Sequence, residues 1–101
     1  MVKFAILAQV TAKAGKESAV EEFLKSALEL ANQEAGTTVW FAIKLSSSRF
    51  GIFDAFPDEA SREAHLAGPI AAALMANATE LLAEPPIIEK ADVLAAKLTK
   101  Q

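Results

Sequence analysis

The stretch FGIFDAFPDEASREAHL, residues 50–66, decides the fold of this chain. Its first part alternates as a β-strand does, a Pro-Asp pair breaks the strand, and a helix begins after Asp58. Asp58 belongs to the residue types that cap a helix N-terminus. The strand carries a carboxylate, Asp54, and the helix carries His65, the only histidine of the chain. Two consecutive elements of a largely apolar domain therefore carry a carboxylate and the sole imidazole.

Hydrophobic periodicity predicts the other elements on both sides of this stretch. Alternation indicates strands, and apolar residues at helical spacing indicate helices. Strands are predicted at 2–11, 37–45, 49–56 and 87–98, and helices at 17–31, after Asp58 and at 70–83. A left-handed Gly36 is expected to end the first helix and Gly68 the second. A turn of three serines separates the strands at 37–45 and 49–56. The order is β-α-β-β-α-β, the ferredoxin-like arrangement.

The fold class is therefore α+β, with one domain over residues 1–101 and a four-stranded antiparallel sheet. Two helices cover only one face of such a sheet, yet the first three strands carry large apolar residues on both faces. A second copy of the same sheet is the simplest cover for the other face. The alternation therefore predicts a homodimer joined through the sheet face, a dimeric α+β barrel.

Composition excludes several function classes. The chain carries a formal net charge of −3 without a basic stripe, so we expect no nucleic-acid partner. It has no cysteine and one histidine, which excludes disulfides, thiolate chemistry and a histidine-cluster metal site within one subunit. No phosphate loop or dinucleotide fingerprint is present, so we expect no cofactor. Residues 1–10 are too short for a signal peptide and no apolar run spans a bilayer, so we expect a cytoplasmic protein without membrane contact.

His65 and Asp54 are the candidates for catalysis. A lone histidine near a cavity can act as general base, proton shuttle or haem ligand, whereas one on a helix face bonds a carbonyl or faces water. Asp54 lies on an apolar strand, where a carboxylate is costly unless it is paired or hydrogen-bonded. It orients His65, pairs with Lys44 or Arg49 across a dimer, or caps a loop, and these alternatives stay open.

Five further side chains are candidates for binding a substrate: Trp40, Gln9, Phe53, Phe56 and Leu74. Trp40 can stack on a flat aromatic ligand, although a lone tryptophan also serves core or dimer packing. Gln9 offers an amide to an apolar cavity, although amides on strands also bond neighbouring groups. Leu74 lies in the apolar helix that can wall such a pocket. Together they predict a small hydrophobic or aromatic ligand.

The residues around Asp54 and His65 resemble the antibiotic biosynthesis monooxygenase (ABM) family. That family ends its third strand with Glu-x-Trp, places a histidine eleven residues after the glutamate, and continues with a Pro-His pair. Asp54-Ala55-Phe56 stands at the Glu-x-Trp position, His65 stands at the histidine, and Ala67-Gly68-Pro69 continues the match. Asp replaces Glu, Phe replaces Trp, and Ile70 replaces the second histidine. Together with the order of elements, the likeness extends over nearly the whole chain.

The resemblance implies a dimer with a cavity between sheet and helices. It also implies oxidation of a small phenol- or quinol-like compound by O₂ without a cofactor, in which a base deprotonates the aromatic and the resulting anion reduces O₂. In this scheme His65 is the base, Asp54 orients it, and Trp40 flanks the substrate ring. The first prediction is thus a cofactor-independent monooxygenase. The alternative is a non-catalytic small-molecule-binding or stress-associated dimer of the same fold, which the missing second histidine favours.

Two other activities of related proteins fit the residues less well. Haem degradation uses a histidine with a tryptophan and an asparagine, whereas this chain has Phe56 at the tryptophan position and Gln9 in the first strand. Isomerisation of a phosphorylated hydroxy-dione needs a cationic phosphate site, to which Lys44 and Arg49 are the available contributors.

Overall fold

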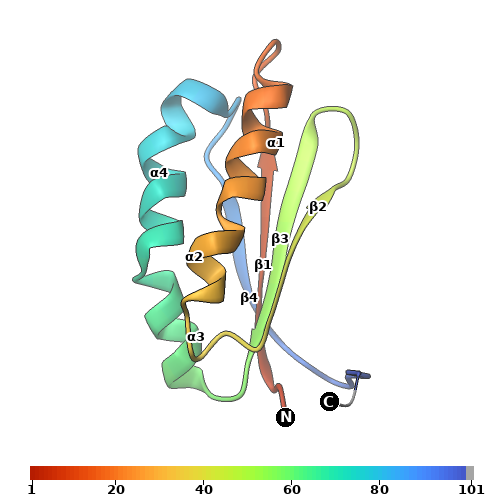
Figure 1. Cartoon of the computed structure of the whole chain (residues 1–101). Coiled ribbons are helices and arrows are strands. Elements are labelled where there is room, and N and C mark those ends of the chain that lie inside the picture. Colours follow the sequence, from red (N-terminus) through yellow and green to blue (C-terminus); the bar gives the residue numbers. More distant parts are fainter. Residues whose placement is uncertain (100–101) are drawn as a thin grey trace.

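The computed structural model describes residues 1–99, in which helices cover one face of a four-stranded sheet (Figure 1). The strand order is β2-β3-β1-β4, and every neighbouring pair is antiparallel. The predicted α+β, ferredoxin-like fold is therefore confirmed. The elements are β1 (Phe4–Thr11), α1 (Glu17–Ser26), α2 (Leu28–Asn32), β2 (Val39–Lys44), β3 (Arg49–Phe56), α3 (Glu59–Leu66), α4 (Pro69–Leu81) and β4 (Ile87–Asp92).

The register of the sheet brings the candidate carboxylate to its centre. Ile6 of β1 pairs with Asp54 of β3, which in turn pairs with Trp40 of β2. Because successive side chains of a strand point to opposite faces, these three share the face that the helices cover. The main core lies on the same face, between the sheet and helices α1 and α4; its buried members are Ala8, Val10, Ala12, Val20, Leu24, Phe50, Ile52, Leu74 and Leu82.

The helices that carry and follow His65 begin where the sequence predicts. Asp58 has extended backbone and accepts a hydrogen bond from the backbone N–H of Ser61 at 2.7 Å, which caps α3. Gly68 is the N-cap of α4, and Pro69 occupies its first turn, where a missing N–H costs nothing. The break between α3 and α4 thus ends α3 at Leu66, so that His65 lies in its last turn, next to the sheet.

Most predicted element bounds lie within two residues of the observed ones, as for α4, predicted at 70–83 and observed at Pro69–Leu81. Three predicted features are wrong. The helix expected at 17–31 is divided at Ala27 into α1 and α2. Gly36 is not a left-handed cap, because Gly15 is the only residue with positive φ among residues 1–99. Gly36 is instead a point of close approach, since a Cβ there would lie 2.6 Å from Oγ of Ser61. The last strand ends at Asp92 rather than at residue 98, because its partner β1 begins at Phe4, which pairs with Asp92.

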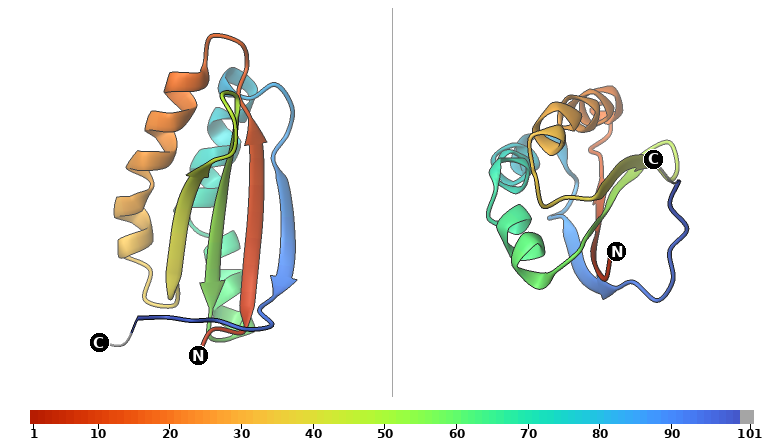
Figure 2. Two further views of the ribbon diagram at one scale, coloured as in Figure 1. Left: turned by 90° about the vertical axis from the view of Figure 1, so that its right-hand side faces the viewer. Right: turned by 60° about the horizontal axis from the view of Figure 1, so that its bottom comes forward.

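The sheet face without helices is rich in exposed apolar side chains. Phe41 on β2 is 55% exposed and Ile87 on β4 is 54% exposed. Figure 2 (left) shows this face toward the viewer, with the helices behind it and the C-terminal segment crossing below the strands. That segment carries Leu94, which is 96% exposed. The homodimer predicted through this face stays a prediction. Among residues 1–99, no helix is long and apolar enough to cross a membrane.

Candidate active site

His65 lies between two carboxylates that come from different parts of the fold. Its Nε2 is 2.8 Å from Oδ2 of Asp54 on β3, and its Nδ1 is 2.7 Å from Oε1 of Glu34, just after α2. The imidazole is buried in the last turn of α3 and packs against the ring of Phe56, with 5.4 Å between the ring centroids. The predicted pair of Asp54 and His65 is therefore a cluster of three.

This environment raises the pKa of His65 above its ordinary value. Burial of the ring is the largest single effect and opposes the charged form. Hydrogen bonding and charge attraction from Asp54 and Glu34 act in the other direction and together outweigh the burial. With a carboxylate beside each nitrogen, the charged form of the ring is favoured.

Asp54 is the most deeply placed member of the cluster. It has no solvent exposure, and within residues 1–99 neither of its oxygens has a well-aligned hydrogen-bond partner. The contact with His65 is therefore an ion pair held by charge rather than by hydrogen-bond direction. The indole Nε1 of Trp40, on the neighbouring strand, is also buried without a partner among the described residues. The sheet side of His65 is thus anchored by one buried charge.

Two hollows meet at the His65 ring. The outer cleft is open and has a volume of about 450 Å³; it is lined by Glu34, Ala35, Gly36, Thr37, Asp58, Ala60, Ser61, Ala64, His65, Gly68 and Pro69. The inner hollow has a volume of about 30 Å³; it is lined by Ile6, Ala8, Ile52, Asp54, His65, Leu66, Ile70, Ala71, Leu74 and Ile88. A site for a small organic ligand needs roughly 300 Å³ or more. Of these two hollows, the outer cleft is large enough, while the inner one has room for about one water.

The structure brings together some of the predicted substrate-binding residues and separates others. Leu74 lines the inner hollow beside Asp54 and His65, and Phe56 contacts the His65 ring. Trp40 packs in the core against Ala27, Ala31 and Ile70 and lines neither hollow.

Gln9 and Phe53 point to the opposite, helix-free face. Gln9 accepts a hydrogen bond from the guanidinium of Arg49, and Phe53 packs with Val2, Ala5 and Ala55. Neither residue lies on the His65 side of the sheet, because strand neighbours of a residue that faces the helices must face away from them.

Glu34 is the member of the site that the sequence does not reveal. It lies in the connection between α2 and β2, and its side chain is 17% exposed at the edge of the outer cleft. Thr37 Oγ1 donates a hydrogen bond of 2.7 Å to the same oxygen that faces His65. The contact with His65 spans 31 residues of chain, so no local pattern signals it. Its position follows from the tertiary arrangement of the chain and not from a local sequence pattern.

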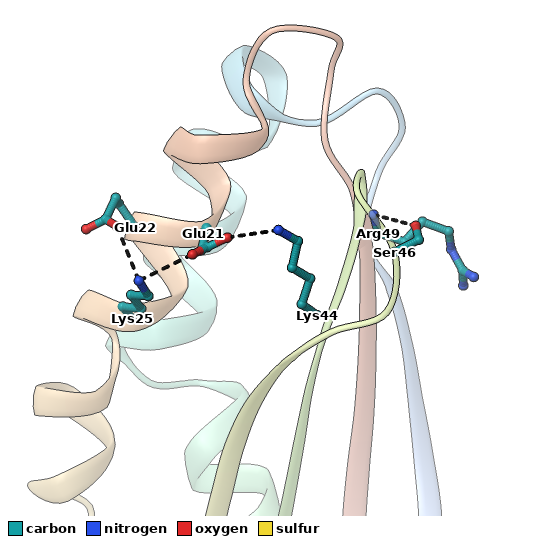
Figure 3. A network of polar contacts seen from close by, with 6 residues as sticks. All are labelled: Glu21, Glu22, Lys25, Lys44, Ser46 and Arg49. Atoms are coloured by element: carbon teal, nitrogen blue, oxygen red, sulfur yellow. Dashed lines mark hydrogen bonds and ion pairs between the residues drawn. The ribbon is translucent and has the colours of Figure 1, made fainter.

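The basic residues considered for a phosphate site lie elsewhere. Figure 3 shows Lys44 reaching across to Glu21 of α1 at 3.3 Å, while Lys25 joins Glu21 and Glu22. The guanidinium of Arg49 points away from this network, toward Gln9. Neither cation lines the outer cleft. In the part of the chain that the structure describes, no group of three or more His, Cys, Asp or Glu residues is arranged to hold a metal ion.

The fold of this chain agrees with that of solved structures. The chain shares its fold with a proposed antibiotic biosynthesis monooxygenase from Nitrosomonas europaea, at 17% identity and a TM-score of 0.80 over 91% of this chain and 90% of that one. A second proposed antibiotic biosynthesis monooxygenase, from Deinococcus radiodurans, aligns at 16% identity and a TM-score of 0.80 over 97% and 99% of the two chains. The resemblance to the ABM fold is thereby confirmed.

One solved structure is much more similar in sequence. The NE2512 protein of Nitrosomonas europaea, described as a protein of unknown function, is 59% identical, with a TM-score of 0.96 over 100% of this chain and 98% of that one. The chain therefore belongs to the same family as NE2512, within the ABM fold. Comparisons with protein-family models and with curated proteins give no match.

Proposed function

We propose that the protein is a monooxygenase that oxidises a small phenol- or quinol-like aromatic compound with O₂ and without a cofactor. The observation that carries this proposal is a histidine in the wall of a cleft of about 450 Å³, backed by a fully buried aspartate. Burial and charge partners of this kind are characteristic of groups that transfer protons. The ABM fold of the chain supports the same reaction class.

The two acidic neighbours of His65 support different roles for its nitrogens. Asp54 fixes the ring from the sheet side through Nε2 and stabilises its charged form, as the buried acid of a catalytic triad does. Nδ1 is on the side of Glu34 and the outer cleft, and there it takes the hydroxyl or ring proton of the substrate. The electron-rich anion then reduces O₂. For a ring methylene the balance is CH₂ + O₂ → C=O + H₂O, so no other reductant is consumed.

The charges around the outer cleft favour a neutral hydroxylated substrate over an anionic one. None of its lining residues is Lys or Arg, whereas Glu34 and Asp58 both contribute carboxylates. Hydrogen bonds from Ser61 lower the pKa of Asp58, which therefore stays charged at neutral pH. A phosphorylated or carboxylated substrate would meet like charge, while phenolic hydroxyls find acceptors. This argues against the phosphorylated hydroxy-dione as substrate.

A homodimer through the helix-free face is part of the proposal. The exposed side chains of Phe41, Ile43 and Ile87 on that face support it, because a second copy would remove them from water. Light scattering at micromolar concentration should give the mass of two chains. Phe41→Glu should shift the protein toward monomer, whereas Met75→Glu on the opposite, helical side should not. A monomeric mass for the unmodified chain would contradict the dimer.

Oxygen uptake over a panel of quinols, anthrones and catechols tests the enzyme proposal. His65→Gln should abolish uptake, since the amide can still bond Asp54 but cannot accept the proton. Glu63→Gln is the matched control, because Glu63 is also on α3 but pairs with Lys90 at 2.7 Å and not with His65. Circular dichroism verifies that each variant is folded.

Absence of turnover on every compound, with ligand binding that His65→Gln leaves unchanged, would favour the non-catalytic binding dimer instead. A cytoplasmic location is likewise proposed.

A further inference from the structure

We propose that Glu34 is the positioning residue that sets which nitrogen of His65 is free. Without substrate it holds a proton on Nδ1; when a substrate hydroxyl displaces Glu34, that proton passes to solvent through the open cleft, and Nδ1 is left free to accept the substrate proton. The contact of 2.7 Å between Glu34 Oε1 and Nδ1 occupies the nitrogen that faces the outer cleft. A ring with both nitrogens taken cannot accept a proton. What this inference says about substrate oxidation rests on the proposed function, whereas what it says about the protonation of His65 does not.

The groups around the His65 ring explain why Glu34 and Asp54 decide its protonation state. A neutral imidazole would turn a lone pair toward one of these two carboxylates, whichever tautomer it adopted. The other elements packed against the inner hollow, β1, α4 and β4, contribute only apolar side chains to it. Arg62, on the same helix, is turned to the carbonyl oxygens of Ala5 and Ala91 and to Glu59. Asp58 is the other charged residue at the outer cleft.

The two carboxylates differ in how easily they can move. Asp54 lies in a strand paired on both sides, and its side chain is buried. Glu34 lies in a connection, its side chain is 17% exposed, and its oxygen is shared with Thr37. That connection lines the cleft and approaches α3 closely at Gly36, where even a methyl group would clash with Ser61. A substrate that enters the outer cleft therefore meets the movable carboxylate, while the fixed one keeps the ring in place.

Because His65 is the only histidine of the chain, ¹⁵N NMR of an untagged sample reports its tautomer and its pKa directly. Glu34→Gln should lower the pKa and leave a neutral ring with its proton on Nε2, facing Asp54. Asp54→Asn should also lower the pKa but leave the proton on Nδ1, facing Glu34. Glu63→Gln, which removes a carboxylate of α3 that does not contact the ring, should change neither.

Chemical rescue distinguishes positioning from a general effect on the fold. Glu34→Ala opens the carboxylate position to the outer cleft, so added acetate should restore the raised pKa of His65 in a concentration-dependent way. Sodium chloride at equal ionic strength should not restore it. Thr37→Val is a milder variant that keeps Glu34 but removes the second donor to its oxygen. The oxygen is then left to His65 alone, so the pKa of His65 should shift in the direction opposite to that in Glu34→Gln, by less.

The activity arm uses the pH profile of oxygen uptake. Glu34→Gln should move the acid limb of kcat/KM to lower pH by the amount by which the NMR pKa falls, with uptake at pH 6 higher than in the unmodified protein. An unchanged tautomer and pKa in Glu34→Gln would overturn the inference, as would a lower uptake at every pH. If no compound is oxidised, the proposed function fails while the NMR result still decides the role of Glu34.

Discussion

Replacing His65 with alanine is expected to leave the Asp54 carboxylate buried without a cation. Asp54 has no solvent exposure, and His65 is its only ion-pair partner among residues 1–99. The unpaired carboxylate must then either stay charged in an apolar environment or take up a proton. Taking up a proton is the less costly of the two in a protein interior.

The cost of that proton sets the size of the effect. Neutralising an ordinary aspartate at pH 7 costs about 4 kcal/mol, because each pH unit above about 3.9 adds about 1.4 kcal/mol. The same calculation gives about 1.5 kcal/mol at pH 5. A small domain is stable by about 5–15 kcal/mol in total, so His65→Ala should lose a large part of its stability at pH 7. Adding Asp54→Asn should recover stability, because a buried amide carries no charge.

Urea unfolding at pH 7 and pH 5 measures this, with the fluorescence of Trp40, the only tryptophan, as the probe. The series contains the unmodified protein, His65→Ala, Asp54→Asn and the double variant. The double variant should be more stable than His65→Ala at pH 7, and the difference should shrink at pH 5. The reasoning would be refuted if the stability losses of His65→Ala and Asp54→Asn add up to that of the double variant to within about 0.5 kcal/mol. A double variant less stable than His65→Ala would refute it as well.

Three further outcomes are expected. Since the folded-state pKa of His65 is raised, its contribution to stability is complete below about pH 6.5 and is lost as the pH rises through the raised value. In urea unfolding between pH 6 and pH 9, the free energy of unfolding should therefore fall by at most about 1.4 kcal/mol per pH unit, and His65→Gln should not show this fall. Asp58→Ala should cost about 1 kcal/mol in the same assay by removing the cap of α3, and an equally stable variant would contradict the assigned cap. Gly36→Ala should lower the melting temperature through its clash with Ser61, and Ser61→Gly should restore part of the loss.

The strand and helix around the site are predictable because their signals are local. β3 matches its predicted bounds, and Asp58, Gly68 and Pro69 mark the helix ends as expected. Each of these signals depends on residues within one turn or one strand. The divided helix at Ala27 and the early end of β4 depend instead on what packs beside them, which periodicity does not report.

The site itself is predictable only in part. Neighbours on a strand face opposite sides of a sheet, so alternation alone separates Phe53 from Asp54. A pocket that contains both residues is therefore incompatible with the predicted strand. Glu34 follows a helix in a sequence that looks like an ordinary polar helix end. Its contact with His65 arises because the connection after α2 returns to the sheet beside α3. Only the tertiary arrangement contains that information.

The separation of the three site residues along the chain has a consequence for how such proteins diverge. Asp54 and His65 lie on one short strand-to-helix segment that also builds the fold, whereas Glu34 lies on a surface connection. A relative can therefore change the residue at position 34 without disturbing the scaffold. We expect proteins of this family that differ there to keep the same architecture and the same acid-base pair, yet to work best at different acidities.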